Sequence, residues 1–147
     1  MQVLLYQIQQ SKNLGMIIRT AVGLNIKKIY LTDPKDLLTK KIKQITNTSQ
    51  GTISNIELIV LENLEEFLKQ YSGRKIASVC NDDNSIELEK FTPKESDLII
   101  FGNERGLPKE IIKHCEIQIT IPMSNKLNSL NIACAFSIIA YNVQTKL

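Results

Sequence analysis

The stretch Asp97–Pro108, DLIIFGNERGLP, decides how this chain folds. It begins with a short apolar run, DLIIF (97–101), which is typical of a buried β-strand, and Pro108 then marks the start of a helix. Between them, two glycines bracket an Asn-Glu-Arg triplet, and an ordinary turn rarely needs so many special residues. The stretch therefore predicts a strand–loop–helix unit whose loop is a candidate binding segment.

The same alternation of strands and helices continues on both sides of this unit. Further strands are predicted at 3–8, 27–31, 56–61, 75–80 and 116–121. Helices are predicted at 14–24, 34–45, 64–71, 108–114 and 129–143, with Pro34 opening one of them, Gly73 ending another and Ser129 capping the last. The fold class is therefore α/β, with one domain over residues 1–147 and a largely parallel sheet flanked by helices.

Composition excludes several classes of protein. The 147 residues are 43% hydrophobic and 22% charged, which is ordinary for a globular domain and excludes disorder. No apolar run approaches the roughly 20 residues that span a bilayer, and the N-terminus lacks the pattern of a secretory signal. The three widely spaced cysteines predict a reducing, cytoplasmic location. The net charge of +3 allows a polyanionic partner without requiring one.

Several common α/β chemistries are absent from the sequence. The loop after the first strand, QQSKNLG (9–15), has no GxGxxG, and the chain contains neither a GxxxxGK[ST] phosphate loop nor a GxSxG nucleophile motif. No carboxylates follow the first strand, as a phosphoacceptor domain would need. His114 is the only histidine, so a catalytic triad or a histidine metal site is not expected.

Ligands of open α/β sheets bind outside the carboxyl ends of the strands, and three such ends carry unusual residues. Asn13, a predicted helix cap, Gly15, which permits close backbone approach, and Arg19 follow the first strand. GNERGLP (102–108) follows the DLIIF strand, and a polar loop leading to Asn131 follows the last strand. Each segment alone also fits an ordinary capped helix or a solvated loop.

Together these segments resemble one family. NLGMIIRTA (13–21), IIFGNERGL (99–107) and IPMSNKLNSLN (121–131), in that order, resemble the three signature motifs of the SpoU-type (TrmH-like) RNA ribose methyltransferases of the SPOUT superfamily. The motifs read N-x-G-x-x-x-R-T-A, I-I-F-G-N-E-x-x-G-L and I-P-M-x(5)-S-L-N. The resemblance runs from Val3 to Tyr141. It implies transfer of a methyl group from S-adenosylmethionine to a ribose 2′-hydroxyl of tRNA or rRNA. It also implies a deep C-terminal trefoil knot, which topology rules would argue against, and a homodimer.

The resemblance also implies residue roles. Arg19 matches an arginine that engages the target phosphate and ribose and assists loss of the hydroxyl proton, and a guanidinium fork suits that role. In the dimer it would face the cofactor of the other chain. Asn13, Glu104 and Asn131 match polar residues that order this surface. The implied cofactor residues are Ser78, Gly102, Ile121, Met123, Ser129 and Leu130.

Two departures from the family pattern are small. The stretch Gln10-Ser11-Lys12 lacks a proline often found before Asn13, and Asn125 stands where a glycine is common. Asparagine tolerates left-handed backbone, so neither departure indicates lost function. We expect no appended RNA-binding domain, no membrane contact and no metal.

Two questions stay open at the level of the sequence. A lysine-rich segment is either a phosphate-contacting face or a solvated helix, and its members are Lys35, Lys40, Lys41 and Lys43. The alternative functions are a non-catalytic RNA-binding or assembly protein on the same fold and a flavodoxin-like domain that binds a small molecule. The second lacks the phosphate loop that it needs.

Overall fold

The computed structural model describes residues 1–80 and 82–147. They form a parallel sheet in the order β3-β2-β1-β6-β4-β7-β5. The strands are β1 (Gln2–Leu5), β2 (Lys28–Leu31), β3 (Glu57–Val60), β4 (Lys75–Val79), β5 (Ile86–Glu87), β6 (Leu98–Phe101) and β7 (Ile117–Thr120). The α/β fold with a parallel sheet is confirmed. β5 was not predicted, because its two residues are exposed and too few to show a pattern.

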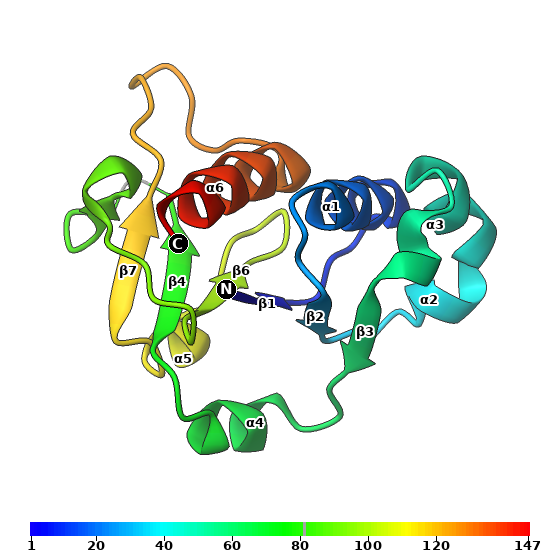
Figure 1. The fold of residues 1–147 in the computed structure, drawn as a ribbon. Coiled ribbons are helices and arrows are strands. Elements are labelled where there is room, and N and C mark those ends of the chain that lie inside the picture. The colour runs from blue at the N-terminus through cyan, green and yellow to red at the C-terminus, as the bar shows by residue number, and fades with distance from the viewer. Residues whose placement is uncertain (81) are drawn as a thin grey trace.

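Helices cover both faces of the sheet. On one face, α6, α1 and α3 lie in a row, and on the other face lie α4 and α5 (Figure 1). Two short 3₁₀ turns, η1 (Thr52–Asn55) and η2 (Leu88–Lys90), complete the chain. The α-helices are α1 (Ser11–Gly23), α2 (Leu37–Lys40), α3 (Ile42–Thr48), α4 (Leu64–Gln70), α5 (Lys109–Ile112) and α6 (Ile132–Lys146).

The β6 strand explains why both helical layers form. All four of its residues are completely buried. Because successive side chains of a strand point to opposite faces, Ile99 and Phe101 belong to the core under α1 and α6, while Leu98 and Ile100 belong to the core over α4 and α5. Phe101 packs against Phe136 of α6 with ring centroids 5.1 Å apart. The apolar run that opens the quoted stretch therefore holds three layers together.

The order of the strands brings particular loops together. β6 lies between β1 and β4, and β7 lies between β4 and β5, so later strands are inserted between earlier ones. The carboxyl ends of the neighbouring parallel strands β6, β4 and β7 consequently meet at one edge of the sheet. The trefoil knot stays a prediction.

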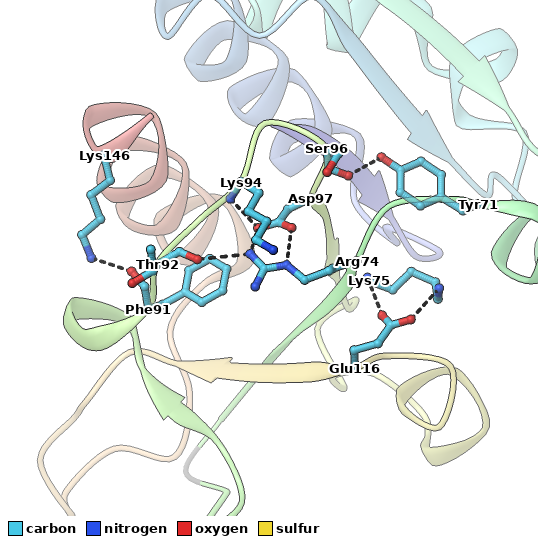
Figure 2. Close-up of polar contacts among 10 residues, drawn as sticks. All are labelled: Tyr71, Arg74, Lys75, Phe91, Thr92, Lys94, Ser96, Asp97, Glu116 and Lys146. Atoms are coloured by element: carbon cyan, nitrogen blue, oxygen red, sulfur yellow. Dashed lines mark hydrogen bonds and ion pairs between the residues drawn. The ribbon is translucent and has the colours of Figure 1, made fainter.

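The opposite edge, at the amino ends of the same three strands, is fixed by ion pairs. Figure 2 shows the guanidinium of Arg74 on the carboxylate of Asp97, with N–O distances of 2.8 and 2.7 Å. Asp97 is completely buried and also accepts the backbone N–H of Lys94. Lys75 binds Glu116 through both its ammonium and its backbone N–H. Burial opposes ionisation of Glu116, but the hydrogen bonds from Lys75 outweigh it and lower the pKa of that carboxyl.

The predicted helix over residues 34–45 is wrong in its boundaries. It is two short helices, separated at Lys41, whose backbone has left the helical region. Pro34 precedes the first of them, and Asp36 adopts a left-handed conformation at its N-terminus. The carboxylate of Asp33 accepts the backbone N–H groups of the first two residues of α2. The helix thus begins where this carboxylate satisfies its free donors, three residues after the proline.

Candidate functional site

A cavity of about 400 Å³ lies where the carboxyl ends of β6, β4 and β7 meet. It is bounded by the end of β4, the β6–α5 loop, the β7–α6 loop and the first turn of α6. Its volume lies within the range of about 300 to 1,000 Å³ that is common for small-molecule sites. The structure brings all six predicted cofactor residues into its wall: Ser78, Gly102, Ile121, Met123, Ser129 and Leu130.

Other residues of this wall were not predicted. Leu107 and Ile112 add apolar surface from the β6–α5 unit, and Ile132 adds more from α6. Asp82 and Arg105 add a carboxylate and a guanidinium, and the predicted Glu104 adds a second carboxylate. Arg105 lies in the loop that the sequence marks as a candidate binding segment, whereas the residues of α5 and α6 enter the wall only because the sheet order brings these elements together. An apolar wall with a few charged side chains of both signs suits a ligand with a flat ring and a charged tail.

The β6–α5 loop has a shape that requires glycine. A Cβ atom built on Gly102 would overlap the backbone of Gly106 and Leu107, which folds back across it. Gly106 has a φ of 83°, in the left-handed region. Its N–H donates to the carbonyl of Asn103, whose side chain accepts the N–H of Arg105. The loop is therefore a tight turn that presents backbone groups to the cavity.

The spacing within this turn corrects one detail of the resemblance. The second motif, G-N-E-x-x-G-L, has two residues between its glutamate and its second glycine. Here Arg105 alone separates Glu104 from Gly106. The second motif is therefore matched in its composition and position, with a turn one residue shorter.

Asn13, Glu104 and Asn131, far apart in sequence, form a chain of hydrogen bonds. The side-chain amide of Asn131 donates to Asn13, and the amide of Asn13 donates to Glu104, both at 3.2 Å. Asn13 is 3% exposed, so this contact is made inside the protein. These hydrogen bonds join α1, the β6–α5 loop and the start of α6, and each of the three residues comes from a different motif segment.

Two predicted helix caps are wrong. The last helix is capped by Asn131, whose side chain accepts the N–H groups of Ala133 and Cys134, and Ser129 lies in the loop before it. Both residue types are good caps, so the sequence left the choice between them undecided. Asn13 is the third residue of α1, which begins at Ser11. Its side chain is therefore free to bind Asn131 and Glu104.

Arg19 lies apart from this cavity. Six residues along an α-helix correspond to about 600° of rotation, so Arg19 and Asn13 point to different sides of α1. Arg19 is exposed and lines a second, shallow groove of about 650 Å³ between α1, α3 and α6. No Asp or Glu is among the described residues that line this groove. Within one chain, the structure does not bring Arg19 to the predicted cofactor residues.

Two features are absent from the described residues. None of their helices is both long and apolar enough to cross a bilayer. Nor do residues 1–80 and 82–147 contain a group of three or more His, Cys, Asp or Glu side chains that could hold a metal ion.

Comparison with known proteins gives consistent results. The chain is 27% identical over 95% of its length to a Mycoplasma pneumoniae protein named as an uncharacterized tRNA/rRNA methyltransferase, and spans 58% of that protein. An AdoMet-bound rRNA methyltransferase from Sinorhizobium meliloti is 24% identical, with a TM-score of 0.86 over 99% of this chain and 56% of that one. A third protein, from a study of 2-OH methylation of C/U34 on tRNA, is 26% identical, with a TM-score of 0.86 over 99% of this chain and 89% of that one.

A sequence model of the SpoU rRNA Methylase family matches residues 1–141, which is nearly the whole chain. The match includes all three motif segments and every element that lines the cavity. The resemblance seen in the sequence is thereby confirmed. This chain belongs to the SpoU rRNA Methylase family.

Proposed function

We propose that the protein transfers a methyl group from S-adenosylmethionine to a ribose 2′-hydroxyl of tRNA or rRNA. The observation that carries the proposal is the cavity at the carboxyl ends of β6, β4 and β7, whose wall contains every residue that the family resemblance assigned to the cofactor. The relative from the study of 2-OH methylation of tRNA supports a ribose hydroxyl as the acceptor, because that protein has almost the same length as this chain.

The residues of the cavity fit this cofactor. Apolar side chains such as Ile121 and Leu130 suit the faces of an adenine ring, and the turn at Gly102 offers backbone groups for its edge. Arg105 and Asp82 provide charges of both signs for a carboxylate and an ammonium. When bound, the cofactor supplies a methyl group that its sulfonium has already activated.

The protein then has two tasks, which are alignment and proton removal. Arg19 would bind the target phosphate and ribose, because its planar fork of donors matches an anion with two acceptor oxygens. The Asn131–Asn13–Glu104 chain would hold α1, which carries Arg19, in register with the cofactor loops. Asn13, Glu104 and Asn131 thus act by positioning in this mechanism.

Since Arg19 does not line the cavity of its own chain, we propose that a second copy supplies it. The groove around Arg19 lies between α1 and α6, and Met16, Ile138 and Tyr141 on these helices expose 43%, 44% and 62% of their surface. Large exposed side chains around an apolar groove are typical of a protein–protein contact. The proposed homodimer buries this surface and brings Arg19 of one chain to the cavity of its partner.

Transfer of labelled methyl groups into bulk tRNA and rRNA tests the function, with digestion to nucleosides to locate the label. We expect 2′-O-methylnucleosides. Arg19→Ala should lower the rate about a hundredfold or more, the usual size of a lost proton-transfer or charge-stabilising group. Lys27→Ala, which removes another exposed cation, is the matched control. Label on a base would refute the ribose assignment, and an Arg19→Ala variant as active as the control would refute the role of Arg19.

A further inference from the structure

The charges of this protein are distributed very unevenly along the chain. Residues 1–55 contain eight Lys or Arg and two Asp or Glu, whereas residues 56–147 contain ten and thirteen. Of the two early carboxylates, Asp33 is already occupied by the N–H groups of α2. The segment from Leu37 to Asn55, which forms α2, α3 and η1, contains three lysines and no carboxylate at all.

These lysines are exposed and without ionic partners in the described part of the chain. Lys40, Lys41 and Lys43, together with Lys35 just before α2, form what we call the basic face. Among the described residues, the one ion pair that involves residues 1–55 is that between Lys28 and Glu57, which lies on β2 and β3. One exposed carboxylate, Asp36, stands within this stretch, and no ion pair of the described residues joins it to these lysines. The basic face thus presents a net positive charge.

The helix that carries Lys43, α3, also borders the groove that contains Arg19. α3 packs tightly on α1, because Gly15 admits the side chain of Thr48 and the carbonyl of Ile45 into direct contact. Ser11 at the start of α1 is hydrogen-bonded to Gln44 of α3. Thr48 itself lines the groove. In Figure 1, α3 stands beside α1 on the side away from α6.

We propose that the basic face binds backbone phosphates of the substrate RNA and holds the strand beside Arg19. The proposal rests on the proposed function and adds the surface by which this domain captures RNA. Lysines act on phosphate as point charges, so they supply affinity without reading sequence. The absence of carboxylates between Leu37 and Asn55 favours a strongly anionic partner, since nothing there would pair with the cations of a mixed-charge protein surface.

The test compares two triple variants that remove equal charge. Lys40→Gln, Lys41→Gln and Lys43→Gln neutralise the basic face, while Lys69→Gln, Lys94→Gln and Lys113→Gln neutralise exposed lysines on or near α4, β6 and α5. Binding to bulk tRNA is measured by anisotropy over a range of salt concentrations. Cofactor binding by calorimetry and the melting temperature are measured in parallel, and both should match those of the unmodified chain for either triple variant.

We expect the basic-face variant to bind tRNA roughly tenfold or more weakly and to lose about 2 from the slope of log affinity against log salt. The control variant should change much less in both quantities. Equal losses in the two variants would mean a general charge effect and would overturn the proposal, as would unchanged binding by the basic-face variant. If the basic-face variant binds tRNA normally and the unmodified chain methylates tRNA, the proposed role of the basic face is refuted and the proposed function stands. If the unmodified chain neither binds nor methylates RNA, both fail together.

Discussion

Asn131 serves two purposes with one side chain. Its oxygen accepts the N–H groups of Ala133 and Cys134 and so caps α6, while its amide donates to Asn13. An asparagine can do both because it carries an acceptor and a donor side by side. The first contact concerns the stability of a helix, and the second concerns the alignment of α1 with the cavity.

Two substitutions separate these purposes. Asn131→Asp keeps an oxygen for the cap and adds charge that a helix N-terminus favours, but cannot donate to Asn13 when ionised. We therefore expect near-normal stability and a rate of methyl transfer lower by about tenfold or more, because small misplacements of reacting groups are costly. Asn131→Ala should in addition lower the free energy of unfolding by about 1 kcal/mol.

Urea unfolding and the methyl-transfer assay measure the two effects. Ser129→Ala is the control for the cap, since Ser129 lies before the helix and should leave its stability unchanged. An Asn131→Asp variant with full activity would show that the hydrogen bond to Asn13 has no part in positioning.

Among the elements, the two edges of the sheet have different roles. At the carboxyl ends, loops of glycine, asparagine and serine enclose the cavity, whereas at the amino ends Arg74 and Asp97 tie the start of β4 to the start of β6 (Figure 2). The sequence assigned no role to Arg74. Its bidentate contact with a buried carboxylate uses the planar geometry of the guanidinium.

Asp97→Asn should destabilise the protein strongly and leave the chemistry of the cavity intact. It removes the negative charge that accepts hydrogen bonds from the guanidinium of Arg74 and the backbone N–H of Lys94. The guanidinium is then left without its charged partner. We expect a loss of about 3 kcal/mol, the low end for a buried pair, because Arg74 keeps 28% of its side chain exposed. Lys69→Ala, which breaks an exposed pair with Glu65, should cost only a few tenths of a kcal/mol.

Denaturant unfolding gives both free energies, and calorimetry with S-adenosylmethionine at low temperature checks the cavity. Equal stability of the two variants would mean that the Arg74–Asp97 pair contributes no more than a surface contact. Loss of cofactor affinity in folded Asp97→Asn protein would contradict the separation of the two edges.

The sequence predicted those elements whose side chains carry their own pattern. DLIIF is a strand because all four residues from Leu98 to Phe101 are apolar and must be buried on both faces. β5 has no such pattern, because its two residues form a strand only through the pairing of Ile86 and Glu87 with β7. The break at Lys41 also has no signal in the sequence, because neither a glycine nor a proline stands there.

The candidate site was also predictable from the sequence only in part. Two of the three segments, the one after DLIIF and the one after the last strand, line the cavity, as expected for loops that follow strands of a parallel sheet. The six cofactor residues themselves were predicted from the family resemblance. The link between Asn13 and Asn131, 118 positions apart, was not, because only the insertion of β6 and β7 between earlier strands brings their elements together. The same holds for the surroundings of Arg19, which depend on how α1 packs against α3 and α6.

At the scale of the whole molecule, the proposed site is incomplete in one chain. The cavity and the groove of Arg19 share one helix, α6, with Ala135 in the wall of the cavity and Cys134 in the wall of the groove. The proposed two-fold dimer would join α1 and α6 and make two composite sites, each with a cavity from one chain and an arginine from the other. We therefore expect each chain to be inactive alone.

Heterodimers of defined composition test this arrangement. Arg19→Ala removes the arginine, and Gly102→Val disables the cavity because its side chain overlaps Gly106 and Leu107. Chains with different affinity tags are co-expressed, and the mixed dimer is purified by both tags.

If Arg19 acts across the interface, the mixed dimer of the two single variants has one intact site and should show about half the activity of the unmodified dimer. A dimer of the unmodified chain with the double variant should then be inactive, because its one good cavity faces the chain without Arg19. Action within one chain reverses both results, so activity in the second dimer and none in the first would refute the composite site. A chain that sediments as a monomer at micromolar concentration while transferring methyl groups would refute it as well.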